Sequence, residues 1–431
     1  MRLITQATRR ISRRSAQNRK KRERLRTVKT KPELLAPAGD RECFDAALMF
    51  GADAVYVGAK EYGMRAAAKN FDMDALQAAV QTAHAQGVKV YLTANTLPRN
   101  AEMDSFPEFI RQVQASGVDA VIAADLGVIS AVRTYAPALT VHASTQTGVV
   151  NYETARVLWN AGVKRVVLAR ELSIAEIAEI RAKTPPELEL EMFVHGAMCM
   201  SVSGRCLLSE YMTGRDANRG ACAQSCRWKY ALMEEKRPGQ YFPVDETEDG
   251  SFILNAKDLC LLPYLDEIAE AGVCSVKIEG RAKAAYYVAG VTNAYRLALD
   301  ALSTGQPVPE WVMQEVSNVS HRPYTVGFAF GQRKDLIWHE RNGYIRDYEV
   351  VGIVQRSEGG RLYVSQRNRF FAGDAVEILM PRVQPLCLNV TDLRNGEGEA
   401  IESANHAVMD CSFLCDADVP AGAFVRKQTA E

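Results

Sequence analysis

The chain has 431 residues, of which 47% are hydrophobic and 24% are charged. These values exclude a globally disordered or collagen-like chain, and no apolar run reaches the ~18 residues that a membrane span requires. The 52 basic and 52 acidic side chains cancel, so the composition does not describe a basic nucleic-acid-binding body.

The charge is unevenly distributed along the chain. The first 30 residues hold 12 Lys and Arg and one acid, Glu23, for a net charge of +11; the other 401 residues hold 40 basic and 51 acidic side chains, for a net of −11. We expect residues 1–31 to form a disordered basic arm, with an early start codon, a transit peptide or a nucleic-acid-binding arm as alternatives. No secretory signal pattern is recognisable, so we expect a soluble, cytoplasmic protein.

From residue 32 onward, short β-branched segments alternate with segments of helical periodicity. Several of the helical segments end in Gly, the usual C-cap residue; they include 40–51, 74–87 and 110–117. Two further helices are predicted at 257–272 and 283–303. The predicted strands cover 32–38, 53–59, 88–95, 118–125, 139–144, 164–170, 188–196 and 275–281.

Eight strand–helix units predict a closed (β/α)8 barrel over residues 32–331, interrupted after its seventh strand by an insertion at 197–257. An open doubly wound sheet is the alternative, but no GxGxxG follows the first strand. Residues 345–431 alternate between Gly-containing turns and predict a small all-β barrel domain. Its cysteines, which we interpret as core or surface thiols, are Cys387, Cys411 and Cys415.

The insertion concentrates cysteines at the barrel end where active sites form. Cys199, Cys206, Cys222 and Cys226 are spaced C-x6-C-x15-C-x3-C. Four thiolates can bind Zn²⁺ or an iron–sulfur cluster. Structural zinc sites usually pair cysteines two to four residues apart, so the uneven spacing favours a cluster. Buried apolar thiols are the alternative, and a Gly-, Arg-, Asn- and Ser-rich loop disfavours it.

Charged residues at strand ends are the other candidates for chemistry. Lys277, Glu279 and Arg281 alternate along the eighth strand and are expected to share one face. Lys and Arg there suit a dicarboxylate, and an internal ion network closing the barrel is the alternative. His195 is predicted as a proton donor or substrate anchor, or else as a residue that fixes the loop. Weaker candidates are Asn95, Ser144, Gln146, Arg170 and Glu171.

The insertion also carries basic and aromatic side chains of the kinds that contact RNA. Arginine and lysine bind phosphates, and aromatic rings stack on extruded bases. A solvated loop with packed aromatics is the alternative interpretation. The residues concerned are Arg205, Arg215, Arg219, Arg227, Trp228, Lys229 and Tyr230.

Several segments carry a family resemblance: FVHGAMCMSVSGRCLLS (193–209), NRGACAQSCR (218–227) and KIEGR (277–281), with ELLAPAGD and GADAVYVG nearer the start. Over residues 32–431 the chain resembles the collagenase-like peptidase family of unassigned catalytic type. It looks most like the branch that hydroxylates the wobble uridine of tRNA to 5-hydroxyuridine. The resemblance implies a 4Fe-4S cluster, independence of molecular oxygen, and prephenate as a required metabolite.

Carried over to this chain, the resemblance assigns the cluster to Cys199, Cys206, Cys222 and Cys226. Cys260 and Cys274 are alternatives for one ligand. The implied partners are tRNA, a small acidic metabolite and, as an option, a paralogous subunit, but no membrane. Lys277 and Arg281 would hold the metabolite.

Other functions stay open at this point. Sister branches of the family act on a ribosomal RNA cytidine or on quinone precursors. The family name itself points to a metal-dependent peptidase, although the chain has no HExxH and no GxSxG motif. A non-catalytic RNA-binding partner of a paralogue is the third class.

Overall fold

A computed structural model describes most of the chain but not the predicted basic arm, of which residues 1–30 lie outside the described part. The described residues are 31–63, 70–199, 201–202, 205–228, 232–233, 241–242, 256–331, 336, 338 and 343–429.

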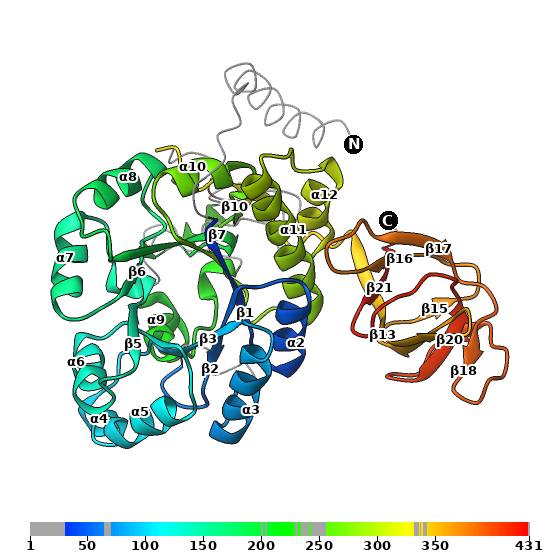
Figure 1. Ribbon diagram of the computed structural model, residues 1–431, viewed down its shortest axis with the longest axis horizontal. Coiled ribbons are helices and arrows are strands. Elements are labelled where there is room, and N and C mark those ends of the chain that lie inside the picture. The colour runs from blue at the N-terminus through cyan, green and yellow to red at the C-terminus, as the bar shows by residue number, and fades with distance from the viewer. Residues whose placement is uncertain are drawn as a thin grey trace, which may run out of the picture.

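Eight parallel strands close into a barrel (Figure 1). Each strand pairs with its sequence neighbour, and the last strand pairs with both the first and the seventh. This confirms the predicted (β/α)8 barrel. The strands are β1 (Glu33–Pro37), β2 (Ala54–Gly58), β3 (Lys89–Ala94), β4 (Ala120–Ala123), β5 (Thr140–Ala143), β6 (Arg165–Val167), β7 (Glu189–Ala197) and β11 (Ser275–Ile278).

Helices cover the outside of this barrel (Figure 1). Several begin at a side-chain cap: Asp40, Asp72, Asp125 and Ser173 each accept a backbone N–H three residues further on. None of the described helices is long and apolar enough to cross a bilayer. They are α2 (Arg41–Met49), α3 (Met73–His84), α4 (Asn100–Met103), α5 (Phe106–Ala115), α6 (Leu126–Tyr135), α7 (Tyr152–Asn160), α8 (Ile174–Ala182), α10 (Leu265–Glu270), α11 (Ala285–Thr304) and α12 (Glu310–Asn318).

The helix predicted at 257–272 is wrong over its first half. Asp258–Cys260 form strand β10, which runs antiparallel to β7 and parallel to β12 (Tyr324–Thr325). Helical structure starts only at the 3-10 turn Leu262–Tyr264, where Pro263 occupies the first turn. Proline disfavours helix in the residue before it, and the long β7 offers an unpaired edge that β10 fills.

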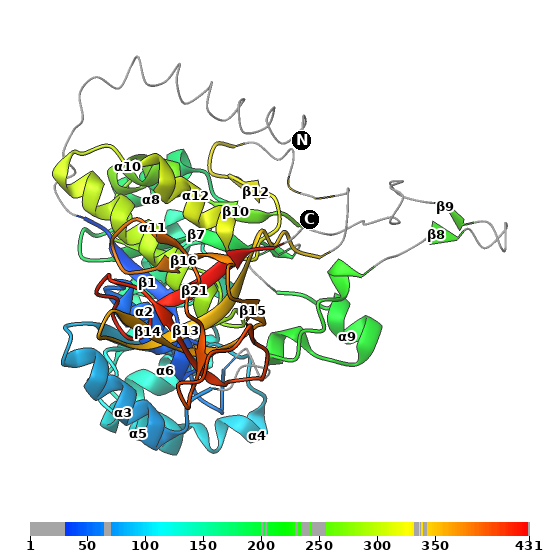
Figure 2. The ribbon, with the colours of Figure 1, turned by 90° about the vertical axis from the view of Figure 1, so that its right-hand side faces the viewer.

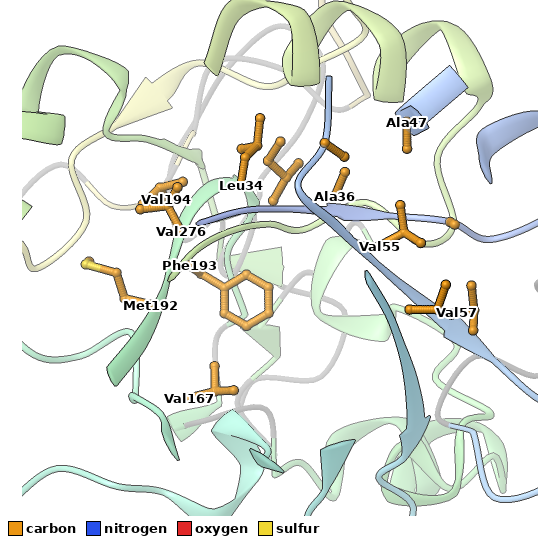
Figure 3. Close-up of a cluster of buried hydrophobic side chains, with 14 of the residues drawn as sticks. Leu34, Ala36, Ala47, Val55, Val57, Val167, Met192, Phe193, Val194 and Val276 are labelled. Carbon is orange, nitrogen blue, oxygen red and sulfur yellow. The ribbon is translucent and has the colours of Figure 1, made fainter. Parts of the chain in front are cut away.

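Alternate residues of the barrel strands face two different hydrophobic layers. Leu34, Val55 and Val276 belong to the large core between strands and helices, part of which Figure 3 shows. Their neighbours Leu35 and Tyr56 belong to a separate cluster inside the barrel. The two-residue period of a strand produces this division, because successive side chains point to opposite faces.

Buried charges fill the barrel interior toward the N-terminal ends of the strands. They connect β6, β7, β11 and β1, the strands at which the barrel closes. The Glu191 carboxylate on β7 is fully buried and accepts from Lys277 of β11 at 3.0 Å and from Arg165 of β6 at 3.1 Å. Arg165 also pairs with Glu33 of β1 at 2.6 Å. Burial alone would raise the pKa of Glu191, but Lys277 and Arg165 outweigh it and lower the pKa to about 2. The carboxylate is therefore charged and held by two cations.

The C-terminal residues form a curled antiparallel sheet with its own core, as predicted for an all-β domain. Seven strands run in the order β17-β16-β21-β13-β14-β20-β18. Cys411 and Cys415 are buried in this domain and Cys387 is exposed. β15 and β19 form a separate antiparallel pair. The strands of the sheet and of this pair are β13 (Tyr348–Glu358), β14 (Arg361–Gln366), β15 (Phe370–Phe371), β16 (Ala375–Leu379), β17 (Leu386–Asn389), β18 (Arg394–Asn395), β19 (Ser403–Ala404), β20 (Asp410–Leu414) and β21 (Phe424–Gln428).

A buried arginine joins this domain to the barrel. Arg426 on β21 pairs with Glu315 of α12 at 2.7 Å and with Glu377 of β16 at 2.6 Å. The same guanidinium donates to the Tyr286 hydroxyl on α11 at 3.0 Å. Phe424 packs beside Tyr286, with ring centroids 5.9 Å apart. The contact is therefore both apolar and ionic.

Replacing Glu191 should destabilise the barrel strongly. Glu191→Gln leaves Lys277 buried without a counter-charge, and breaking a buried pair by removing one partner costs about 3–5 kcal/mol. Glu189→Gln is the matched control, since that carboxylate is 33% exposed and also contacts Arg165; its loss should stay within about 1 kcal/mol. Urea unfolding measures both, and equal losses would contradict the assigned role of Glu191.

The pH dependence of stability should carry the signature of the same carboxylate. Its folded-state pKa of about 2 lies below the ordinary value of 4.5, so the unfolded chain binds the proton first as the pH falls. The stabilisation is complete above about pH 4.5 and is lost as the pH falls toward 2. Unfolding free energies across that window should fall more steeply for the wild type than for Glu191→Gln, whereas parallel curves would refute the assignment.

Candidate functional site

The cysteine-bearing insertion leaves the barrel at the C-terminal end of β7 and returns through β10. Its described part contains a helix, α9 (Leu208–Thr213), followed by the 3-10 turns η3 (Ala217–Arg219) and η4 (Ser225–Arg227). A two-strand pair follows, β8 (Leu232–Met233) with β9 (Tyr241–Phe242). Figure 2 shows α9 to one side of the barrel strands, with β8 and β9 farther out.

Two buried or half-buried polar side chains hold the insertion in shape. The Ser209 hydroxyl donates to the Arg215 carbonyl at 2.7 Å and accepts the Ala223 N–H at 2.9 Å, next to Cys222. Asn218 accepts the Cys206 N–H at 3.2 Å and donates to the Cys206 carbonyl at 3.0 Å. The backbone around Cys206 and the backbone just after Cys222 are thus fixed by contacts within the loop.

Three contacts fasten the insertion across the mouth of the barrel. Arg205 donates from Nε to the Gln146 carbonyl at 2.7 Å, and Gln146 follows β5. Arg219 pairs with Glu102 of α4 at 2.8 Å. The Leu97 N–H, after β3, donates to the Asn218 carbonyl at 3.4 Å. The chain that leaves at β7 therefore reaches the loops after β3 and β5.

The four predicted cluster ligands all lie in or next to this loop, and none forms a disulfide. Cys199 and Cys222 are exposed and Cys206 and Cys226 are half-buried. The Cys206 sulfur accepts the Leu208 N–H and the Cys222 sulfur accepts the Gln224 N–H, each at 3.4 Å. Among the described residues, no three His, Cys, Asp or Glu side chains are close enough together to hold a metal.

The donor chemistry nonetheless fits a thiolate-bound iron–sulfur cluster. Accessible thiols with backbone N–H groups directed at their sulfurs are the donors that such clusters use. The two alternative ligands fit less well. Cys274 lies at the opposite end of the barrel, just before β11, where its thiol donates to the Leu190 carbonyl. Cys260 is buried beside Tyr295, and burial raises the pKa of each of these two thiols to about 11.

Arg170 connects three strand ends where the insertion begins. It donates from Nη1 to the Ala197 carbonyl at 2.5 Å, pairs with Glu279 at 3.2 Å, and places its guanidinium 3.9 Å from the Phe193 ring centre. Ala197 lies two residues before Cys199. Arg170 therefore fixes the path of the chain toward the first cysteine.

His195 does not face the barrel mouth. The β7–β11 register shifts between Lys277 and Ile278, so that Phe193 pairs with Lys277 but His195 pairs with Ile278, on the outer face. The imidazole lies among tyrosines, 3.4 Å from the Tyr295 hydroxyl and 3.3 Å from the Tyr324 hydroxyl. Burial lowers its pKa to about 3, so it is neutral at physiological pH. This placement favours the structural interpretation over the proton donor.

Gly196, the next residue, explains the HG pair of the sequence. Its φ is +104°, and a Cβ there would lie 2.4 Å from the Glu279 carbonyl oxygen. Only glycine permits both the backbone conformation and the close approach.

The three charged residues around β11 lie in different surroundings. Lys277 belongs to the buried ion network, which supports that interpretation and leaves its charge already balanced by Glu191. Glu279 pairs with Arg170. Arg281 is buried at the barrel mouth, and its guanidinium donates to the Thr93 hydroxyl. The guanidinium lies against Gly58, where a Cβ would be 2.8 Å from its central carbon. Of the two cations, Lys277 and Arg281, the second lies nearer the mouth.

The weaker candidates and the RNA-type residues are distributed as follows. Asn95 donates to Gln146 at 3.0 Å, and Ser144 caps the turn that carries Gln146. Glu171 is half-buried beside Arg170, and Trp228 is 43% exposed. Lys229, Tyr230 and the side chain of Arg227 lie outside the described residues.

Two features of the site were not predicted from the sequence. The acidic partner of Lys277 is Glu191. The available signal was the alternation of acidic and apolar residues over 188–191, at the start of β7. Tyr211 on α9 is 87% exposed. The available signal was its spacing from Leu207, four residues earlier, which puts two large apolar side chains on one face of a helix.

Removing the Arg205 contact should loosen the insertion without unfolding the barrel. A hydrogen bond from a charged donor is worth about 1.5 kcal/mol at the low end, which corresponds to roughly tenfold more opening. Arg205→Ala should therefore be cleaved by chymotrypsin within residues 205–228 about tenfold faster than the wild type. Arg215→Ala, which removes an exposed arginine of the same loop, is the control, and equal cleavage rates of the two variants would contradict the anchoring role.

Comparisons with known proteins give the family. The model of peptidase family U32 matches residues 39–338, and that of the peptidase family U32 C-terminal domain matches residues 346–426. The chain is 35% identical over 416 residues to tRNA hydroxylation protein P of Escherichia coli, covering 87% of this chain and 91% of that protein.

Two further relatives match along most of their length. The chain is 35% identical over 410 residues to tRNA hydroxylation protein P1 of Bacillus subtilis, covering 93% of this chain and 96% of that protein. It is 31% identical over 399 residues to a collagenase of Porphyromonas gingivalis, covering 86% of this chain and 92% of that protein. With its barrel and its C-terminal domain both matched, the chain belongs to peptidase family U32.

Proposed function

We propose that this protein is an RNA-modifying hydroxylase acting on a tRNA uridine. The observation that carries the proposal is similarity over nearly the whole chain to two proteins named for tRNA hydroxylation. The likeness includes both domains, so it is not confined to a common barrel scaffold. We further propose the wobble uridine as the target, 5-hydroxyuridine as the product, no requirement for molecular oxygen, and the cytoplasm as the location.

Cys199, Cys206, Cys222 and Cys226 would hold a 4Fe-4S cluster. Such a cluster supplies electron transfer when it is bound. The N–H groups of Leu208 and Gln224 already point at two of the sulfurs and would stabilise their thiolate forms. Arg170 and Asn218 would fix the backbone from which the cysteines project.

A small acidic metabolite, prephenate in this proposal, would bind at the barrel mouth. Arg281 is the residue that we assign to a carboxylate, because it is a buried guanidinium at the strand ends and arginine binds carboxylates bidentately. Lys277 lies deeper and pairs with Glu191 at 3.0 Å, so its charge supports the barrel.

A peptidase is the second candidate function, and the similarity to a protein named collagenase favours it. The geometry offers it less support. Among the histidines that the structure describes, none hydrogen-bonds a serine or cysteine side chain, so no nucleophile–base pair of the kind used in acyl transfer is present there. Pure protein should leave gelatin intact if hydroxylation is the function.

Deleting the gene should remove 5-hydroxyuridine from the wobble position of tRNA, as measured by mass spectrometry of digested tRNA. Wild-type protein should restore the modification and Cys222→Ser should not, because one cluster ligand is lost. Cys387→Ser, an exposed cysteine of the C-terminal domain, is the matched control and should restore it. Unchanged hydroxyuridine in the deletion strain would defeat the proposed function.

The cluster itself is tested on protein purified without oxygen. Iron, sulfide and visible absorption should be present in the wild type and in Cys387→Ser, and should be reduced in Cys222→Ser. Absence of iron and sulfide from the wild-type protein would refute the cluster while leaving the fold unaffected.

A further inference from the structure

The described part of the insertion exposes an unusual number of large apolar side chains. Of the 14 exposed large hydrophobic side chains among the described residues, five fall between residues 202 and 228. We call these five the insertion surface. They are Val202, Leu207, Tyr211, Met212 and Trp228, exposed by 68%, 72%, 87%, 40% and 43%.

This exposure is built on a fixed scaffold. Leu207 and Tyr211 are four residues apart across the start of α9 and share one face. The helix is closed by Gly214, whose N–H donates to the Glu210 carbonyl at 2.7 Å, and is tied down by the buried Ser209 hydroxyl. The five exposed apolar side chains gather within 27 residues and are not scattered singly over the chain, so we interpret them as a contact surface for a partner.

The insertion surface adjoins the cysteines on both sides. Leu207 directly follows Cys206, and Trp228 lies two residues after Cys226. The segment that carries Tyr211 packs against the turn that carries Cys226, because α9 and η4 are in contact. A partner that covers the insertion surface is thereby brought to the proposed cluster ligands.

The local charge favours an anionic partner. Residues 202–228 hold four arginines, Arg205, Arg215, Arg219 and Arg227, against two acids, Glu210 and Asp216, for a net charge of +2. The chain from residue 31 onward has a net charge of −11. Arg215 is exposed four residues after Tyr211. Aromatic rings beside arginines stack unpaired bases while the arginines contact phosphates.

From these observations we propose that Tyr211 and Trp228 form a stacking platform for an unpaired base of the RNA substrate, with Arg215 on the adjacent phosphate. This inference rests on the proposed RNA-modifying function and names the surface that would bind the RNA. A duplex cannot use the platform, because its bases are already stacked on one another.

The test measures the affinity of full-length protein for a labelled RNA hairpin with uridines in its loop, and for a blunt RNA duplex of equal length. Tyr211→Ala should weaken hairpin binding by about 5- to 150-fold, the effect of losing one stacked base, and should leave duplex binding unchanged. Tyr211→Phe, which keeps the ring, should bind the hairpin as the wild type does.

Tyr135→Ala is the matched control, because Tyr135 is also exposed, by 40%, but lies at the far end of α6. It should bind the hairpin normally. Circular dichroism and iron content of Tyr211→Ala should equal those of the wild type, which separates the platform from folding.

The outcomes distinguish this inference from the function on which it rests. If the wild type and Tyr211→Ala bind the hairpin equally well, the platform is overturned and the proposed function stands. Failure of the wild type to bind any RNA would overturn both. A change in sedimentation-derived oligomeric state without a change in RNA affinity would assign the insertion surface to a protein partner and overturn the platform.

Discussion

The closure of the barrel depends on a carboxylate held between two cations. Glu191 on β7 lies between Lys277 of β11 and Arg165 of β6, and Arg165 extends the contact to Glu33 of β1. These are the strands at which the sheet must close on itself. Hydrophobic pairing alone would not specify which strand follows β7, whereas a buried charge requires its own partner in place.

This arrangement divides the barrel into two parts with different roles. The ion network occupies the interior toward the N-terminal ends of the strands, so that space is filled by the protein itself. Arg170, Glu279 and Arg281 lie toward the C-terminal ends, where Arg170 also holds the start of the insertion through the Ala197 carbonyl. The register shift between β7 and β11 supports this division. It turns His195 outward, beside Tyr295 and Tyr324, and the chain then leaves the barrel after Gly196.

Strands and helices were largely predictable because their signals are local. The apolar segments at 53–59 and 88–95 each contain the observed strand, and β-branched alternation is enough to find them. The helix at 257–272 failed over its first half because the edge of β7, some sixty residues away in sequence, captures residues 258–260. Local periodicity carries no information about such a partner.

The site was predictable in its residue types more than in its geometry. The cysteine spacing located the insertion, but the direction of His195 depends on a one-residue register shift between β7 and β11. The role of Lys277 depends on Glu191, 86 residues earlier. Both require knowledge of which strands are neighbours, which a single sequence indicates only through the fold.

Arg426 has a consequence for how the barrel and the C-terminal sheet of this chain depend on each other. In sequence the C-terminal sheet is a separate unit with its own core. Its stability is coupled to that of the barrel, because Arg426 pairs with Glu315, a side chain of α12 in the barrel that is only 4% exposed. Removing the sheet would open Glu315 to water and remove its cation together, whereas replacing Arg426 alone would leave the carboxylate covered and uncompensated, so the barrel tolerates a missing sheet better than a sheet that lacks this one arginine.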